Sequence, residues 1–448
     1  MNLKLTVTTV ENNAAHTRTA PLAFAGDTAG EEMHVLNLYP QVRYQTFDGF
    51  GGAMTEAAAW TYAQMSPENR QKILDACFGE GGLGYSWGRI SVDSCDFSLG
   101  HYEAMSNPAD TELASFTLAA DERYVIPFLR AAEETAGRPL HLLLSPWSPP
   151  AFMKSTGERN HGGFLKPEYY DFWAKYLCRY IQEYRRRGFT VDLLSVQNEP
   201  KATQIWDSCV YTAGQEKTFL RDALAPALRA NGLEDVGVCI WDHNKERVFE
   251  RACDVIDADT DALVQGVAFH WYSGDHFEAV RMTGERFPDK KLIFSEGCVE
   301  YSNFDAGDTL GHAQMYAHDI IGNLNAGMQL FLDWNILLDE RGGPNHVGNF
   351  CSAPIMCHTG EDRVILNPSY DFIGHFSRNI QPGAVRIGCS TYTDRLEATA
   401  FENPNGSFAA VLLNRTEQEL PVNLRLCGKL SGFTLPANSI ASLNIGNR

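Results

Sequence analysis

Short apolar runs alternate with longer segments of helical periodicity through most of the chain. Each run has the length of a buried strand, and several end in a polar residue or a glycine. This alternation predicts an α/β fold, a (β/α)8 TIM barrel with parallel strands inside a ring of helices. The eight predicted strands comprise residues 47–54, 87–93, 140–146, 193–199, 236–242, 266–272, 292–296 and 328–335.

The pattern changes at both ends of the chain. After about Phe376 the runs become shorter and alternate residue by residue, and the segment 403–406 (Asn-Pro-Asn-Gly) is a hairpin signal, which predicts an accessory all-β sandwich domain. Near the N-terminus, residues 3–9 indicate an exposed edge strand, a polar loop follows to Glu32, and residues 35–38 indicate a second strand. Two strands are not stable alone, so they are expected to pair with the C-terminal domain. The predicted parts are N-terminal strands over 1–43, a barrel over 44–375 and a β-sandwich over 376–448.

Composition and charge narrow the class of protein. The chain has 448 residues, of which 44% are hydrophobic, enough for a large core. Its net charge of −19 argues against a nucleic-acid partner or an anionic membrane surface, whereas a neutral substrate such as a sugar is compatible. No apolar run reaches the length of a membrane span, so no stable membrane insertion is expected.

The 11 cysteines are odd in number and scattered without a CxxC pair, which indicates reduced thiols. No secretory signal is visible among the first 20 residues. A cytoplasmic protein of bacterial type is therefore expected, and a secreted one only if a signal segment has been removed.

Two glutamates follow predicted strands in similar settings. Glu199 lies in Gln-Asn-Glu-Pro after an apolar run, and Glu296 lies in Phe-Ser-Glu-Gly after another. Glycoside hydrolysis needs such a pair, because one carboxyl group protonates the leaving oxygen while the other attacks the anomeric carbon or activates water. The alternative is that Asn198 and Glu199 only open a loop or cap the next helix.

Aromatic and polar residues accumulate at the same predicted strand ends. Trp147, the segment 270–272 (His-Trp-Tyr) and Trp334 offer flat rings that suit sugar faces, although core packing explains a single tryptophan equally well. Asp96 is a candidate ligand for hydroxyl groups, and Arg89 is either a charge partner in the site or part of a structural salt bridge. No second His or Cys stands at ligand spacing from His270, so neither a metal nor a cofactor is expected.

Taken together, these motifs resemble glycoside hydrolase family 30, the glucosylceramidase family. The resemblance runs from about Phe47 into the C-terminal domain. The motifs are Phe-Asp-Gly-Phe-Gly-Gly at 47–52, Ser-Cys-Asp-Phe-Ser at 94–98, Ser-Pro-Trp-Ser-Pro at 145–149, Asn-Glu-Pro at 198–200, His-Trp-Tyr at 270–272, Phe-Ser-Glu at 294–296, Asp-Trp-Asn at 333–335 and Gly-Gly-Pro-Asn at 342–345.

The resemblance implies a retaining β-glycosidase with a barrel and a side β-sandwich. It implies that Glu199 is the acid/base, that Glu296 is the nucleophile and that Asn198 binds the sugar 2-hydroxyl. We expect the carboxyl groups of Glu199 and Glu296 to lie about 5 to 5.5 Å apart, as retention requires. We also expect the negative charge of Glu296 to raise the pKa of Glu199. The other candidate substrate-binding residues are Asp96, Trp147, Trp334, Asn349, Tyr272, His270 and Arg89.

The substrate class follows less closely from the motifs. The strand-end motifs favour a β-glucosidase or glucosylceramidase, acting on a small glycoside or a glycolipid, over the alternatives of β-xylosidase, β-fucosidase and β-1,6-glucanase. Residues 201–209 differ from the animal lysosomal members and border the leaving-group side, so the aglycone preference stays open. A catalytically silent sugar-binding protein is a remote alternative, which the two intact glutamates disfavour.

Overall fold

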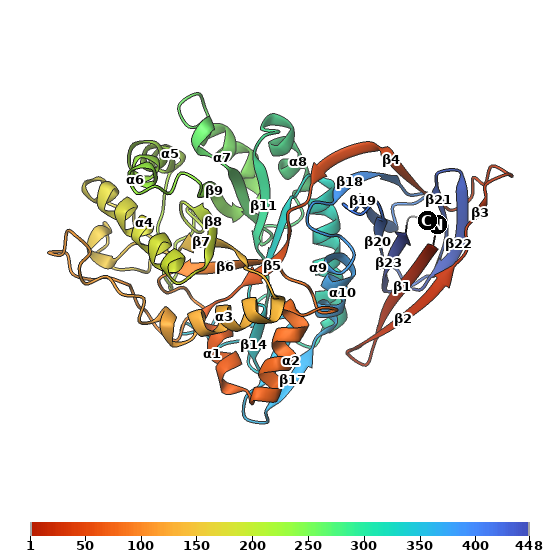
Figure 1. Ribbon diagram of the computed structural model, residues 1–448, viewed down its shortest axis with the longest axis horizontal. Helices are drawn as coiled ribbons and strands as arrows, with labels where there is room; N and C mark the ends of the chain where they lie inside the picture. Colours follow the sequence, from red (N-terminus) through yellow and green to blue (C-terminus); the bar gives the residue numbers. More distant parts are fainter. Residues whose placement is uncertain (1, 447–448) are drawn as a thin grey trace.

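The barrel predicted from the sequence is present and closed. The computed structural model describes residues 2–446, and Figure 1 shows the helix-covered barrel beside a separate β-rich part. The barrel strands are all parallel and follow the order β10-β11-β13-β5-β6-β7-β8-β9. Their bounds are β5 Gly49–Ala53, β6 Trp87–Val92, β7 His141–Pro146, β8 Thr190–Ser195, β9 Gly237–Asn244, β10 Gly266–His270, β11 Lys291–Glu296 and β13 Leu330–Asp333.

The barrel interior is filled by side chains, so it is not a channel. Residues such as Trp87, Leu143, Leu193 and Ile293 form one buried apolar cluster that draws on seven of the eight barrel strands and fills the interior between them. Gly51 of β5 has to be a glycine, because a Cβ there would collide with the backbone of Trp87 in β6. Polar chemistry is therefore confined to the carboxyl ends of the strands.

Ten α-helices accompany the strands through the described residues, and most of them cover the barrel. The helix α2 begins as its sequence dictates, with the Ser66 hydroxyl accepting from the Asn69 N–H and Pro67 in the first turn. No helix within residues 2–446 is long and apolar enough to cross a membrane. The helices are α1 Glu56–Gln64, α2 Pro67–Phe78, α3 Val125–Ala136, α4 Tyr170–Arg186, α5 Ala213–Phe219, α6 Ala225–Ala230, α7 Val248–Val255, α8 Phe277–Arg286, α9 Thr309–Asn325 and α10 Pro368–Ser377.

The β-sandwich part is one curled, ten-stranded sheet that combines both ends of the chain. Its order is β2-β1-β23-β20-β19-β18-β4-β21-β22-β3, so N-terminal strands pair with C-terminal ones. It has an apolar cluster of its own, separate from that of the barrel. The strands are β1 Asn2–Glu11, β2 Ala14–Leu22, β3 Ala25–Gly26, β4 Val35–Thr46, β18 Val385–Ser390, β19 Leu396–Glu402, β20 Phe408–Asn414, β21 Leu420–Leu426, β22 Lys429–Leu435 and β23 Ser439–Gly446.

Two expectations for the N-terminal segment are wrong. The polar stretch after residue 11 is not a loop, because Ala14–Leu22 forms β2 and pairs with β1 along its length. β2, rather than β1, is consequently the edge strand, and β1 lies between β2 and β23. The strand predicted at 35–38 extends as β4 to Thr46 and carries the chain from the sandwich to the barrel (Figure 1).

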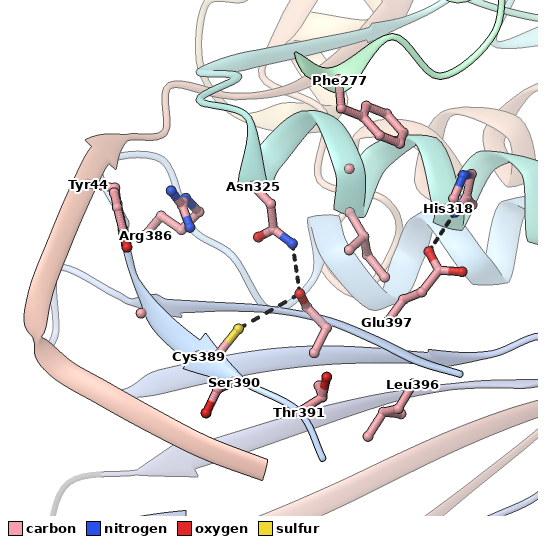
Figure 2. Close-up of a pocket in the computed structure, with 14 residues that line it drawn as sticks. Tyr44, Phe277, His318, Asn325, Arg386, Cys389, Ser390, Thr391, Leu396 and Glu397 are labelled. Atoms are coloured by element: carbon pink, nitrogen blue, oxygen red, sulfur yellow. Dashed lines mark hydrogen bonds and ion pairs between the residues drawn. The ribbon is translucent and has the colours of Figure 1, made fainter. Parts of the chain in front are cut away.

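Helices α9 and α10 join the barrel to the sandwich. In Figure 2, His318 of α9 contacts Glu397 of β19, and the Asn325 amide donates to the Ala398 carbonyl at 2.9 Å. These side chains line a cavity of about 510 Å³ between the two parts. On α10, His375 reaches hydroxyl groups of both β1 and β23. Polar contacts from buried helices therefore fix the sandwich against the barrel.

Small sheets flank the barrel next to these helices. β12 pairs with β15, and β14, β16 and β17 form a three-stranded sheet. β12 directly follows the end of β11, so the smaller pair lies close to the polar end of the barrel. Their bounds are β12 Val299–Glu300, β14 Leu337–Asp339, β15 Cys351–Ser352, β16 Ile355–His358 and β17 Arg363–Leu366.

Candidate active site

A pocket of about 210 Å³ lies at the carboxyl ends of the barrel strands. Of the ten candidate residues, Arg89 and His270 are fully buried and do not line the pocket, although both contact its carboxylates. The other eight line it together: Asp96, Trp147, Asn198, Glu199, Tyr272, Glu296, Trp334 and Asn349.

Glu199 is held by a turn rather than by a strand. Strand β8 ends at Ser195, and the next residues bend back so that the Asn198 N–H donates to the Pro146 carbonyl at 2.8 Å and the Glu199 N–H to the Asp242 carbonyl at 2.9 Å. Glu199 itself has a φ of 47°, an unfavourable backbone conformation for a residue with a side chain. Such conformations cluster at functional sites, where surrounding contacts maintain them.

His270 brings the two glutamates together. Its Nδ1 lies 3.3 Å from Glu199 Oε1 and 3.9 Å from Glu296 Oε1. Because both distances start from the same nitrogen atom, the two glutamate oxygens lie no more than 7.2 Å apart. That limit includes the separation of about 5 to 5.5 Å for retention and excludes most of the inverting range of about 6.5 to 9.5 Å.

Glu296 is fixed by two donors. The buried Arg89 guanidinium forms an ion pair with Glu296, and the Tyr272 hydroxyl donates to Glu296 Oε1 at 3.0 Å. Arg89 also donates to Asn198 at 2.8 Å and forms an ion pair with Asp242 at 3.0 Å. Arg89 is therefore both a charge partner in the site and part of a structural salt bridge, since its ion-pair network positions the Glu296 carboxylate.

Burial and neighbouring charges shift the pKa values of the two glutamates and of His270. Burial raises the pKa of Glu199, but the His270 hydrogen bond and the His243, His270 and Arg89 charges lower it by more, so it lies below its ordinary value. Burial raises the pKa of Glu296, and the charges of His270 and Arg89 offset this only in part. Burial lowers the pKa of His270, but the surrounding carboxylates raise it to about 9. The expectation that Glu199 has a raised pKa is wrong for the substrate-free site, because two imidazoles face its carboxylate.

Asp96 and two tryptophans also line the pocket. Asn345 and Asn349 donate to Asp96 at 3.2 and 3.4 Å, while burial and the charge of Glu296 raise the pKa of Asp96 to about 8. A carboxyl group of that kind both donates and accepts hydrogen bonds, as sugar hydroxyls require. Trp147 and Trp334 stack on each other with centroids 5.2 Å apart and cover Arg89, so these indoles also support the network.

Several residues that line the pocket or support its side chains were missed from the sequence. The most important is Asp242 near the end of β9, which is fully buried and holds both Arg89 and His270 Nε2, the latter at 3.1 Å. The signal was available, because Asp242 ends its apolar run just as Glu296 does. The other pocket residues that sequence reasoning did not select are Gln204, Trp206, His243, Asn244, Cys298 and Glu300.

The fold also supplies a neighbour for His270 that sequence spacing did not reveal. His243 lies in β9, the strand next to β10, and its Nδ1 is 3.6 Å from Glu199 Oε1. Glu199, His243 and His270 each offer one ligand atom, and the three atoms lie within 4.8 Å of one another. These are the residue types that hold transition metals.

Comparison with known proteins agrees with this geometry. Residues 47–380 match the glycosyl hydrolase family 30 TIM-barrel domain, and residues 383–443 match the family 30 beta sandwich domain. The chain is 33% identical over 409 residues to the lysosomal acid glucosylceramidase of Mus musculus. The aligned region covers 87% of this chain and 79% of the relative.

Two further relatives show the range of the group. The endo-1,6-beta-D-glucanase of Neurospora crassa is 26% identical over 412 residues, covering 86% of this chain and 82% of the relative. Among solved structures, SrfJ from Salmonella typhimurium matches all of both chains with a TM-score of 0.95 and 36% identity. With both domain types matched in order and a relative above 30% identity, the chain belongs to glycoside hydrolase family 30.

Proposed function

We propose that this glycoside hydrolase is an exo-acting retaining β-glucosidase in which Glu296 is the nucleophile and Glu199 is the acid/base. The observation that carries the proposal is the pair of glutamates around His270, at the base of a pocket of about 210 Å³. That volume is below the roughly 300 to 1,000 Å³ of sites for drug-sized ligands. It suits a single sugar ring, so the enzyme removes terminal residues.

The first step is attack by the Glu296 carboxylate on the anomeric carbon. Arg89 and Tyr272 hold that carboxylate in place, and Glu199, ionised in the substrate-free site, takes up a proton from the imidazolium of His270 and passes it to the leaving oxygen. His270 supports the transfer, since its Nδ1 lies 3.3 Å from the Glu199 oxygen. The product is a covalent glycosyl-enzyme ester on Glu296.

In the second step Glu199 takes a proton from water, which attacks the anomeric carbon, breaks its bond to the Glu296 oxygen and releases the sugar with its original β configuration. Asn198 contributes by binding the 2-hydroxyl group next to the reacting carbon, where hydrogen bonds strengthen in the transition state. Its side-chain oxygen accepts from Arg89 at 2.8 Å, so its amide NH2 remains oriented for the sugar.

Glucose is the proposed glycone because the pocket offers hydrogen-bonding groups besides the two glutamates. Asp96, supported by Asn345 and Asn349, offers hydrogen bonds to hydroxyl groups far from the scissile bond. A second candidate is cleavage of β-1,6-linked glucans, which is favoured by the relatives named as endo-1,6-β-glucanases. The glucosylceramidases among the relatives support a glycolipid aglycone instead.

The test is hydrolysis by the purified chain of aryl β-glucoside, β-xyloside and β-fucoside, glucosylceramide, and a β-1,6-glucan chain. We expect the β-glucoside to be preferred and the first product seen by proton NMR to be the β-anomer. An initial α-anomer would refute retention, and internal cleavage of the glucan would refute exo action.

Role assignment needs matched variants. Glu296→Gln should abolish turnover, whereas Glu278→Gln, the same change on exposed α8, should leave it unchanged. Glu199→Ala should spare substrates with good leaving groups, because acid catalysis contributes roughly 10²- to 10⁴-fold, and azide should rescue it as the β-glycosyl azide. If Glu296→Ala gave that β-product instead, the two roles would be reversed.

A further inference from the structure

The Glu199–His243–His270 cluster has the dimensions of a metal site. Glu199 Oε1 lies 3.3 Å from His270 Nδ1 and 3.6 Å from His243 Nδ1. Ligands about 2.0 to 2.1 Å from a tetrahedral Zn²⁺ ion are separated from one another by about 3.3 Å. The ligand atoms of His243 and His270 lie within 4.8 Å of each other, so an ion can bind all three atoms once the two imidazoles move closer together.

The surroundings orient both imidazoles for this purpose. His270 Nε2 lies 3.1 Å from Asp242 Oδ1, and a carboxylate can only accept, so Nε2 carries the hydrogen and Nδ1 faces Glu199. Carboxylate–histidine pairs of this kind hold the ligands of zinc enzymes. The Nδ1 atom of His243 is buried and makes no hydrogen bond with any group of residues 2–446.

Charge favours a cation at the same point. Glu199, Glu296 and Asp242 place three carboxylates around two cations, the Arg89 guanidinium and the His270 imidazolium, and a metal ion that binds His270 Nδ1 displaces the proton held there. Imidazole and carboxylate ligands select Zn²⁺, Cu²⁺ or Ni²⁺, whereas Mg²⁺ and Ca²⁺ prefer sites made of oxygen atoms alone.

We propose that Glu199, His243 and His270 form a binding site for one divalent transition-metal ion, and that the bound ion inhibits the hydrolase. The ion has three protein ligands and an open side toward the pocket, which both Glu199 and His243 line. While Glu199 binds the ion, it cannot protonate a leaving group. Binding goes beyond the proposed function and does not depend on it; only the inhibition rests on the role of Glu199.

Direct binding is measured first, with Co²⁺ as the spectroscopic probe and Zn²⁺ as its competitor. The full chain is used after EDTA treatment, with the exposed Cys253 and Cys427 replaced by serine in every protein to remove thiol sites. We expect one Co²⁺ per chain, with the intense visible absorption of a four-coordinate ion, which Zn²⁺ displaces and Mg²⁺ does not.

Three variants locate the site. His243→Phe and Glu199→Gln should each weaken Zn²⁺ binding by more than about 100-fold, since even partners that only orient the ligands contribute about 10- to 100-fold. The control variant His16→Gln, which changes an exposed histidine on β2, should bind Zn²⁺ with the same affinity as the unchanged protein. Far-ultraviolet circular dichroism confirms that each variant is folded, and two independent ligand variants keep the test decisive if one is not.

Each result counts for or against the site. Loss of the Co²⁺ absorption in both ligand variants, together with reversible inhibition of aryl β-glucoside hydrolysis at the Zn²⁺ concentration that fills the site, supports the proposal. Equal Zn²⁺ affinity in His243→Phe, or no stoichiometric binding, overturns it. If the chain hydrolyses no β-glycoside, the proposed function fails, and the Co²⁺ spectrum still decides whether the site exists.

Discussion

His375 should make this protein less stable as the pH falls. The ring is fully buried on α10, and its two nitrogens lie 2.8 Å from the Thr8 hydroxyl on β1 and 3.0 Å from the Ser442 hydroxyl on β23. Burial, with a smaller contribution from the Arg378 charge, lowers the pKa of His375 to about 3. The folded protein therefore holds this imidazole neutral throughout the mildly acidic range.

The magnitude follows from proton linkage. In the unfolded chain a histidine has a pKa of about 6.5, so below that pH unfolding takes up a proton that the folded state does not hold. The free energy of unfolding consequently falls by about 1.4 kcal/mol for each pH unit between 6.5 and the folded-state pKa. From pH 7.5 to pH 5.0 the loss due to this single residue is about 2 kcal/mol.

The assay compares the unchanged protein with His375→Gln, whose amide can hydrogen-bond both hydroxyls but does not titrate. Urea unfolding is followed by tryptophan fluorescence at pH 7.5 and 5.0. The unchanged protein should lose about 2 kcal/mol more than the variant over this range, and any packing cost of the variant cancels because it is present at both pH values. His16→Gln, at an exposed histidine, should behave like the unchanged protein. Equal losses in the protein and in His375→Gln would refute the reasoning.

Three further predictions concern the barrel. Tyr272→Phe removes the hydrogen bond to Glu296 and should lower kcat by roughly 10- to 100-fold with little change in KM, because a hydrogen bond to a charged group contributes about 1.5 to 3 kcal/mol; unchanged steady-state kinetics would contradict it. Lys245→Met leaves Asp319 as a buried charge without its partner and should cost about 3 to 5 kcal/mol in urea unfolding, most of it recovered by adding Asp319→Leu. Gly51→Ala should prevent soluble expression, since its Cβ would collide with the backbone of β6; a soluble barrel of normal Tm would contradict this.

The barrel could be predicted because each of its strands is buried on both faces. A run such as Leu142–Leu144 is continuously apolar, and the intervening helices repeat with a different period, so the alternation is visible without any contact information. β2 lacks such a signal: its residues, Ala14–Leu22, are almost all exposed, and only pairing with β1 makes them a strand. The short strands β12 and β14 to β17 depend on their neighbours in the same way.

The site shows the same division between local and spatial information. Glu199 and Glu296 were identified because each follows an apolar run and the pair matches a known chemistry. Asp242 and His243 were missed because their importance arises from position: both lie on the strand next to β10, where Asp242 contacts His270 and His243 lies 3.6 Å from Glu199. The predicted direction of the Glu199 pKa shift was wrong for the same reason, because the shift depends on the imidazoles of His243 and His270, which only the fold brings close.

The shared sheet of the two chain ends has a consequence for biosynthesis. β1 leaves the ribosome before any barrel strand, yet its partner β23, at Ser439–Gly446, is made only after the whole barrel. Until then β1 has only β2 beside it, and its apolar residues Leu3, Leu5 and Val7 lack the core they enter later. A nascent chain must therefore keep this hairpin from aggregating while the barrel folds. Because Asn2 of β1 pairs with Gly446 of β23, joining these two strands by a short linker and opening the chain at an exposed loop should give a permuted protein in which β1 and β23 are synthesised consecutively.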